Sequence, residues 1–251
     1  MRVVHGEKGR ITMKYIGLIT LLIFSIWVMY AIVSTIVLRK CSTKVIRKLI
    51  EKDGILLTFD DGPHPEYTVK LLKLLKKHNA RAVFFVVGEL VDKYPNIIKQ
   101  MHAEGHMIGI HHYKHLSNWR LLPHQTKRQI NKTKQSIEKI IGENVVLYRP
   151  PWGHFNLATL LHVGELQTVM WSHIYKDWKS RNHHLENLLT NLPEGGSILL
   201  LHDNGDTKGA DETAPLEMMS YLKRYLVQME KEKRTFAEPR VLLKGKEGQQ
   251  L

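Results

Sequence analysis

The longest apolar stretch of the chain lies near its N-terminus. Residues 15–38 contain no charged side chain and consist mainly of Ile, Leu, Val, Phe, Met and Trp. A run of this length spans the hydrocarbon core of a bilayer as a helix. A cleaved signal peptide usually has a shorter apolar core and a small-residue cleavage site. We therefore predict an uncleaved transmembrane anchor over residues 15–38.

Basic segments flank this run on both sides. Residues 1–14 form a polar, basic N-terminal segment, and residues 39–53 form a basic connector that we expect to be helical. The downstream cluster of Lys and Arg is at least as strong as the upstream one. By the positive-inside rule alone, this distribution favours a cytoplasmic C-terminal domain.

Downstream of the connector, residues 54–245 alternate short apolar runs with amphipathic segments. The expected strands are 55–59, 81–87, 107–110, 145–148, 167–171 and 197–201, with a last strand from 235–236 and 241–243. The expected helices are 66–78, 89–104, 125–141, 156–163, 184–192 and 212–230. This repeated order indicates an α/β fold, a parallel sheet closed or nearly closed into a barrel. Residues 246–251 are expected to be a disordered tail.

Composition limits the possible partners. With 251 residues, 43% of them apolar, the chain can bury one sizeable core plus an appendage. Its single cysteine, Cys41, rules out an intramolecular disulfide. The net charge of +13 favours an anionic surface such as a membrane or an acidic wall polymer. No nucleic-acid motif is present, and we expect a monomer.

Polar residues follow most of the expected strands. In parallel α/β barrels the site lies at the carboxyl ends of the strands. The first strand leads into two adjacent carboxylates, Asp60 and Asp61, which a turn at Gly62-Pro63 can bring to one point. The residues after the later strands are His111, His112, His115, Arg149, Trp152, Asp177, Trp178, His202 and Asp203.

Two of these histidines have the spacing of a metal site. His111 and His115 are four residues apart, so on one helical turn they share a face. Together with a strand-end carboxylate they form the three-ligand set of a catalytic metal site. One of the two aspartates can then ligate while the other takes a proton from water. The alternatives are surface histidines and a helix-capping role for the carboxylates.

The remaining polar residues suit acid–base chemistry. Arg149 can hold a carboxylate bidentately, and His202 can donate a proton to a leaving group. Asp177 can orient that imidazole, and Trp152 and Trp178 offer flat faces to sugars. Each also has a structural alternative: a surface arginine, a core histidine, a helix cap and core tryptophans.

Five segments occur in a recognisable order. They are Thr58-Phe59-Asp60-Asp61-Gly62, His111-x-x-x-His115, Arg149-Pro150-Pro151-Trp152, Asp177-Trp178 and Leu199-Leu200-Leu201-His202. This order resembles the motifs of the polysaccharide deacetylases, carbohydrate esterase family 4, over residues 50–240. The resemblance implies a NodB-type deformed (β/α) barrel. It also implies removal of N-acetyl groups from amino-sugar polymers with a divalent metal, usually zinc.

The resemblance also implies a role for each matched residue. Asp60 is then the base, steadied by Arg149, and His202 is the acid, tuned by Asp177. The implied metal ligands are Asp61, His111 and His115. The implied substrate contacts are Trp178, Leu200 and Trp152, whose backbone N–H matches the family's oxyanion donor.

Three positions depart from the family pattern. His112 stands where Ser or Thr is usual, Ile110 where Asn is frequent, and Ile174 in place of the first acid of Asp-x-x-Asp-Trp. The first two positions adjoin the implied metal ligands and can change metal affinity. None of the three removes a residue with a direct role.

The sequence therefore predicts a membrane-anchored deacetylase of peptidoglycan or a chitin-like chain. Because such polymers lie outside the cell, the resemblance places the domain outside, against the weak charge preference. One alternative is deacylation of a lipid-linked amino sugar. Another is a catalytically weakened glycan-binding module, which the intact Asp60, Arg149 and His202 disfavour.

Overall fold

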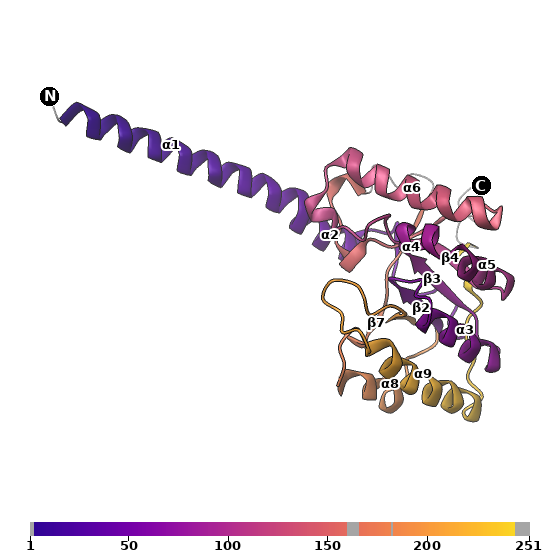
Figure 1. The fold of residues 1–251 in the computed structure, drawn as a ribbon. Helices are drawn as coiled ribbons and strands as arrows, with labels where there is room; N and C mark the ends of the chain where they lie inside the picture. The colour runs from indigo at the N-terminus through magenta and orange to yellow at the C-terminus, as the bar shows by residue number, and fades with distance from the viewer. Residues whose placement is uncertain (1–2, 160–165, 182, 244–251) are drawn as a thin grey trace, which may run out of the picture.

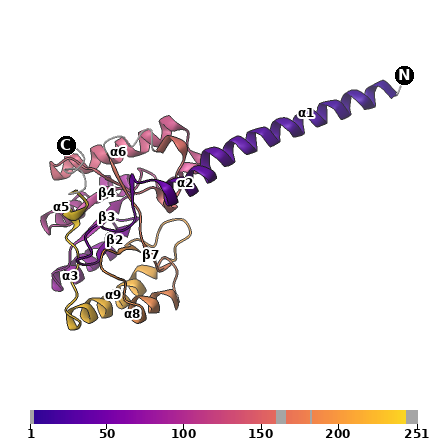
Figure 2. The ribbon, with the colours of Figure 1, turned by 180° about the vertical axis from the view of Figure 1, so that it is seen from behind.

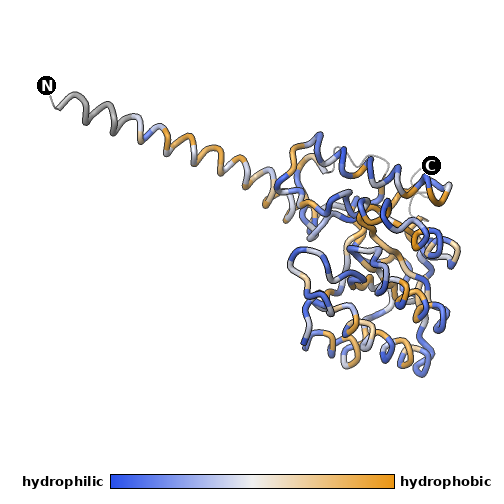
Figure 3. The backbone as a smooth tube through the Cα atoms, in the orientation of Figure 1, coloured by the Kyte–Doolittle hydropathy of each residue, from blue (hydrophilic) through white to orange (hydrophobic). Residues whose placement is uncertain are grey.

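A long N-terminal helix projects from an α/β domain (Figure 1). The computed structural model describes residues 3–159, 166–181 and 183–243. The projecting rod comprises α1 (Val3–Val28), a π-helical turn η1 (Met29–Val33) and α2 (Ser34–Cys41). Its stretch Thr12–Cys41 is long and apolar enough to cross a membrane (Figure 3), and within it residues 12–27 are exposed, whereas Ala31, Thr35 and Leu38 are buried. The expected anchor, residues 15–38, is thus helical throughout.

The domain is built on one eight-stranded parallel sheet. Its strands are β1 (Val45–Ile46), β2 (Leu56–Asp60), β3 (Ala82–Val86), β4 (Met107–Ile110), β5 (Leu147–Tyr148), β6 (Gln167–Val169), β7 (His173–Ile174) and β8 (Ile198–His202). The order across the sheet is β1-β6-β5-β4-β3-β2-β8-β7, so β1 and β7 form the two edges. The prediction of a parallel sheet curled into a deformed barrel is confirmed.

Helices pack around the outside of this curled sheet (Figures 1 and 2). They are α3 (Tyr67–Lys77), α4 (Gly88–Lys93), α5 (Pro95–Ala103), α6 (Pro123–Ile141), α8 (Asn187–Thr190) and α9 (Ala214–Lys231). The short 3₁₀ segments are η2 (Asn118–Arg120), η3 (Pro151–Gly153), η4 (His183–Glu186) and η5 (Pro239–Leu243). Pro95 divides the expected helix 89–104 into α4 and α5, because proline has no N–H to continue a helix.

Alternation along the strands decides which side chains face the helices. Successive strand residues point to opposite faces, and in β2 Leu57 and Phe59 join the large core under the helices. Leu56 belongs instead to a second cluster on the inner, concave face. By the same alternation Thr58 and Asp60 lie on the inner face. The alternation along β2 therefore places its polar side chains on the concave inner face of the sheet.

The predicted conformation of two elements was wrong. The connector 39–53 is helical only to Cys41; it then forms edge strand β1, whose Val45 pairs with Thr168. The last expected strand is instead the 3₁₀ helix η5, and only Phe236 bridges the sheet, at Ile55. Both segments pack apolar residues against the inner cluster, and this packing holds them in conformations that their local sequence pattern does not indicate.

Two other expectations fall partly or wholly outside the described residues. These are the helix 156–163, beyond residue 159, and the tail 246–251.

Candidate active site

Asp60 ends β2 on the inner face of the sheet and is buried against Arg149. The guanidinium donates from Nη1 to Asp60 Oδ1 and to Thr58 Oγ1, both at 2.7 Å. Its Nε and Nη2 donate to the carbonyls of Val169 and Met170, each at 2.9 Å. The bidentate contact that we expected is therefore not formed, because the rest of the guanidinium is fixed on β6 and the residue after it. Arg149 joins the strands as well as the carboxylate.

Asp61 turns away from Asp60 at the strand end. Its φ of 80° lies in the left-handed region, and its buried carboxylate faces a different set of partners. Oδ2 accepts a hydrogen bond from Thr207 Oγ1 at 2.8 Å. Oδ1 lies 3.3 Å from Nε2 of His111 and 3.0 Å from Nε2 of His115. The two adjacent aspartates thus have different main partners, an arginine and two imidazoles, although Asp60 Oδ2 also lies 3.8 Å from Nε2 of His111.

The two histidines reach Asp61 from a loop, not from a helix. His111 directly follows β4, and both His112 (φ 63°) and His115 (φ 47°) have left-handed backbones. The prediction that His111 and His115 share a helical face was wrong. The loop still places their ring centroids 5.1 Å apart. The Nδ1–H of His111 donates to the carbonyl of Arg149 at 2.8 Å, so Nε2 is the ring nitrogen that faces Asp61 and can act as a ligand.

This cluster fits a divalent cation. One ligand atom from each of Asp61, His111 and His115 lies within 4.8 Å of the other two. Asp61 Oδ1 is buried and has no hydrogen-bond partner among the described residues, although the two imidazole nitrogens lie close to it. Burial alone would raise the pKa of Asp61, but the neighbouring histidines, His115 foremost, hold that pKa well below its usual value. An ionised carboxylate with two imidazoles is a common zinc-ligand set.

His202 faces the pocket from the opposite side and is held by Asp177. The backbone N–H of His202 donates to Asp177 Oδ2 at 2.6 Å, and its ring Nδ1 lies 2.9 Å from Oδ1. Burial opposes the charged imidazole, but Asp177, followed by Asp61 and Asp60, raises the pKa of His202 to about 9. The imidazole is therefore a protonated acid at neutral pH, with Nε2 as its remaining N–H.

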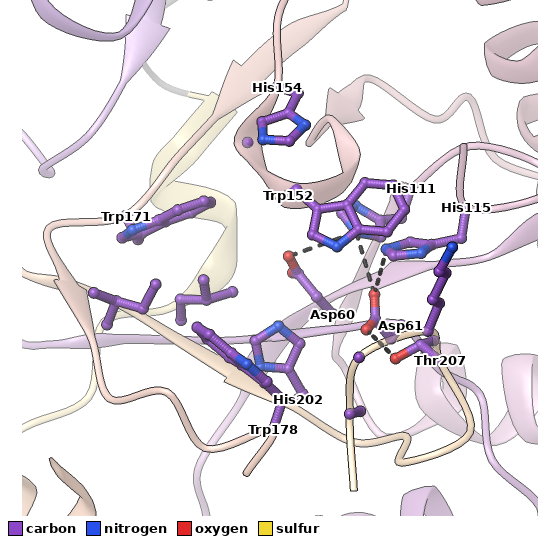
Figure 4. Close-up of a pocket in the computed structure, with 16 residues that line it drawn as sticks. Asp60, Asp61, His111, His115, Trp152, His154, Trp171, Trp178, His202 and Thr207 are labelled. Carbon is purple, nitrogen blue, oxygen red and sulfur yellow. Dashed lines mark hydrogen bonds and ion pairs between the residues drawn. The ribbon is translucent and has the colours of Figure 1, made fainter. Parts of the chain in front are cut away.

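These groups line one pocket of about 340 Å³ (Figure 4). The sequence-predicted residues in its wall are Asp60, Asp61, His111, His115, Trp152, Trp178, Leu200 and His202. Arg149 and Asp177 lie behind the wall, buried beside the side chains that they hold. Trp152 has a φ of 55°, and its half-exposed indole packs over His115 with centroids 4.3 Å apart.

Sequence reasoning missed several residues in the pocket or directly beside it. Thr207 bonds to Asp61, and Asn204 Nδ2 donates to the Asp61 carbonyl at 3.0 Å. Trp171 and His154 add aromatic surface to the wall. The position of Thr207 depends on the loop after β8, which no periodicity describes. Trp171 ends an expected strand, so alternation could have placed it.

His112, the main departure from the family pattern, is part of a buried network. Its Nδ1 donates to the Leu116 carbonyl at 2.8 Å, and its Nε2 accepts from the Tyr148 hydroxyl at 2.8 Å. Asn118 Nδ2 donates to the same hydroxyl at 3.0 Å. Burial lowers the pKa of His112 to about 3, so the ring is neutral. This histidine braces the loop that carries the two metal-ligand candidates.

With this geometry established, comparison with known proteins is decisive. Residues 48–171 match the model of the family described as polysaccharide deacetylase. A peptidoglycan-N-acetylglucosamine deacetylase of Bacillus cereus is 35% identical over 177 residues, which cover 68% of this chain and 82% of that protein. The chain belongs to the polysaccharide deacetylase family. Three of the five ordered motifs that we singled out, those at Asp60-Asp61, His111–His115 and Arg149–Trp152, lie within the matched residues.

Two further matches differ in how much of each protein they cover. A second B. cereus peptidoglycan-N-acetylglucosamine deacetylase is 38% identical over 156 residues, covering 60% of this chain but only 56% of that protein. The crystal structure of a peptidoglycan N-acetylglucosamine deacetylase superimposes with a TM-score of 0.69 at 28% identity, covering 79% of this chain and 92% of the other.

Proposed function

We propose that this polysaccharide deacetylase is a metal-dependent hydrolase that removes N-acetyl groups from an amino-sugar glycan. The carrying observation is that a carboxylate (Asp60), an imidazole (His202) and the cluster of Asp61, His111 and His115 line one pocket, each with its own supporting partner. Asp60 is hydrogen-bonded to Arg149, and His202 is hydrogen-bonded to Asp177. Asp61 of the ligand cluster is hydrogen-bonded to Thr207. A module that only binds glycan would need neither the carboxylate of Asp60 held by Arg149 nor the imidazolium of His202 held by Asp177.

Asp61, His111 and His115 would hold the divalent ion. Such an ion polarises a carbonyl and lowers the pKa of water. Zinc is the metal that we propose from the donor set of one carboxylate and two imidazoles. The hydrogen bond from His111 Nδ1 to the Arg149 carbonyl fixes the tautomer needed for ligation.

The acid and the base divide the proton transfers. Asp60, held in place by Arg149, takes a proton from the attacking water as the water oxygen bonds to the acetyl carbon. The backbone N–H of Trp152 is the proposed donor to the oxygen that becomes negative. His202 then donates its Nε2 proton to the sugar nitrogen as the C–N bond breaks. The products are acetate and a free amine.

The proposed substrate is peptidoglycan or a chitin-like chain. Both B. cereus relatives bear names of enzymes that act on N-acetylglucosamine in peptidoglycan. The pocket carries exposed aromatic surface at Trp152 and is open enough for a sugar ring. Trp178 packs edge-on against His202 with centroids 5.2 Å apart, so it can contact substrate beside the acid.

We also propose that the enzyme stays anchored by residues 15–38 with its domain outside the cell. The rod continues into the domain, where Thr35 is buried, so the helix is part of the folded unit. Protease added to intact, wall-stripped cells should degrade the domain spanning residues 54–245. Protection until the membrane is opened would place the domain inside and remove wall polymers as substrates.

Acetate release by the full-length protein in detergent tests the proposed activity. Acetylated peptidoglycan fragments and N-acetylglucosamine oligomers are the substrates. Release should stop on treatment with a chelator and return on addition of zinc. Activity that is unaffected after verified removal of the metal would contradict metal dependence, and no release from any acetylated glycan would contradict the function.

A further inference from the structure

The last turns of the projecting helix are docked on the domain. Trp27 Nε1 donates to the Trp119 carbonyl at 3.0 Å, and the Tyr30 hydroxyl donates to the Leu121 carbonyl at 3.2 Å. The indoles of Trp27 and Trp119 also meet edge to face, with centroids 6.3 Å apart. The π-helical turn η1 lies at this point of contact. The helix is therefore fixed to the domain well before its apolar run ends.

The docking site adjoins the wall of the pocket. Thr35 Oγ1 accepts from the indole N–H of Trp119 at 2.9 Å, and Trp119 stacks on His154 with centroids 3.7 Å apart. The guanidinium of Arg39 lies 5.0 Å from the ring centroid of Trp171. His154 and Trp171 both line the pocket. One layer of side chains thus separates the anchor from the proposed active site.

The free apolar part of the helix is too short to cross a bilayer. Tyr15–Ile26 precedes the contacts of Trp27 with the domain, and 12 residues at 1.5 Å each extend only about 18 Å. The hydrocarbon core is about 30 Å thick. About eight more residues, starting at Trp27, are needed to complete the span, and Trp27 and Tyr30 among them contact the domain. On the outer side of the helix Met29 and Ile36 remain exposed and apolar, as lipid contact requires.

The domain surface around the contact between the helix and the domain exposes apolar side chains. Leu122 and Leu157 are each 57% exposed. Asn156 ties their two loops together, because its Nδ2 donates to the Asn118 carbonyl at 2.8 Å. We call Trp119, Leu122 and Leu157 the rim.

Basic residues next to the rim carry the positive charge that anionic lipid headgroups attract. The side chains of Lys40, Lys44 and Arg120 are exposed near the end of the rod and beside the rim, where anionic headgroups attract basic groups. Aromatic residues such as Trp119 are enriched at the headgroup level.

We infer that the rim lies in the headgroup layer of the membrane and that the active-site pocket opens at the bilayer surface. This inference rests on the proposed membrane anchor. The loop after β8, which carries Thr207, projects from the same side of the domain as α1 (Figures 1 and 2). The substrate class that fits is an N-acetylated amino sugar held close to the membrane, on a lipid carrier or at the membrane end of a glycan chain.

Fluorescence quenching in nanodiscs tests the position of the rim. Cys41 is exposed and is the only cysteine, so a Cys41→Ser background allows one label per protein. Full-length Leu122→Cys and Leu157→Cys proteins receive an environment-sensitive fluorophore in discs of anionic lipid. A share of the lipids carries a nitroxide at the headgroup. Ile23→Cys, with nitroxide on the acyl chain, verifies insertion, and Lys231→Cys, at the far end of α9, is the distant control.

We expect quenching at Leu122→Cys and Leu157→Cys to be at least threefold stronger than at Lys231→Cys. Equal quenching at all three sites in discs where Ile23→Cys is quenched would overturn the inference. The same discs, loaded with zinc and given a soluble N-acetylglucosamine oligomer, separate this outcome from the proposed function. Acetate release without rim quenching rejects only the membrane rim, and rim quenching without release rejects only the deacetylase.

Discussion

Nη1 of Arg149 lies 2.7 Å from Oδ1 of Asp60, and both side chains are buried. Removing one partner of a buried ion pair leaves an uncompensated charge, which costs about 3–5 kcal/mol. We expect Arg149→Gln to lower the free energy of unfolding by about that amount. Urea denaturation at pH 7 measures it.

The matched control is the exposed pair of Lys179 and Asp211, whose atoms are 2.8 Å apart. Exposed pairs contribute about 0–1 kcal/mol, so Lys179→Gln should change little. Equal, small losses in both variants would show that the Arg149–Asp60 contact does not hold the structure together.

His111→Ala and His115→Ala should each lose the divalent ion. Both imidazoles lie within 3.3 Å of Asp61 Oδ1, and a site with two of three ligands binds weakly. Elemental analysis of dialysed protein gives the metal content. His154→Ala is the control, because His154 lines the same pocket without belonging to the ligand cluster. Full metal content in either ligand variant would reject the assignment.

His202 should titrate near pH 9 in the metal-free protein. Asp177 is the main group that raises its pKa to about 9 from an ordinary 6.5. The imidazolium is therefore fully protonated below pH 6.5, and its stabilising pairing is lost as the pH rises through 9. NMR of the ring carbon measures this pKa directly.

In Asp177→Asn the pKa of His202 should fall well below 9. The alkaline limb of acetate release should move to lower pH in the same variant, since turnover needs the protonated acid. An unchanged titration in Asp177→Asn would show that Asp177 does not set the charge of His202.

Stability should depend on pH at His106, which lies outside the pocket. Burial lowers the pKa of His106 to about 4, and its Nδ1 accepts from the Ala82 N–H at 3.1 Å. The neutral ring contributes stability above pH 6.5 that is lost as the pH falls toward 4, because the unfolded chain binds the proton first. The slope is at most about 1.4 kcal/mol per pH unit. His106→Gln should flatten this slope, whereas exposed His124→Gln should keep it.

Alternation accounts for much of what the sequence could predict. Arg149 and His202 are on the same face of their strands as Leu147 and Leu200, and this face is the inner one. Leu57, Phe59, Leu199 and Leu201 occupy the other face under the helices. Because successive side chains of a strand point to opposite faces of the sheet, the sequence predicts which strand residues face the pocket.

Loop conformation was not predictable in this way. His111 and His115 were expected on a helical turn because four-residue spacing is helical, but left-handed residues in the loop bring them together. Thr207 and Asn204 reach Asp61 through hydrogen bonds across the fold, about which local sequence says nothing. Edge strand β1 depends on pairing with β6, which a basic, mixed segment does not signal.

Turnover of Asp60→Asn tests the central claim most directly. The base should be dispensable for metal binding but not for chemistry, since Asp60 contacts Arg149 and the ligand cluster is built on Asp61. Asp60→Asn is therefore expected to keep its zinc and to release acetate about 10²–10⁴ times more slowly, the contribution of general acid–base catalysis. Exposed Asp53→Asn, as control, should match the unaltered protein. Near-normal acetate release by zinc-loaded Asp60→Asn would contradict the account.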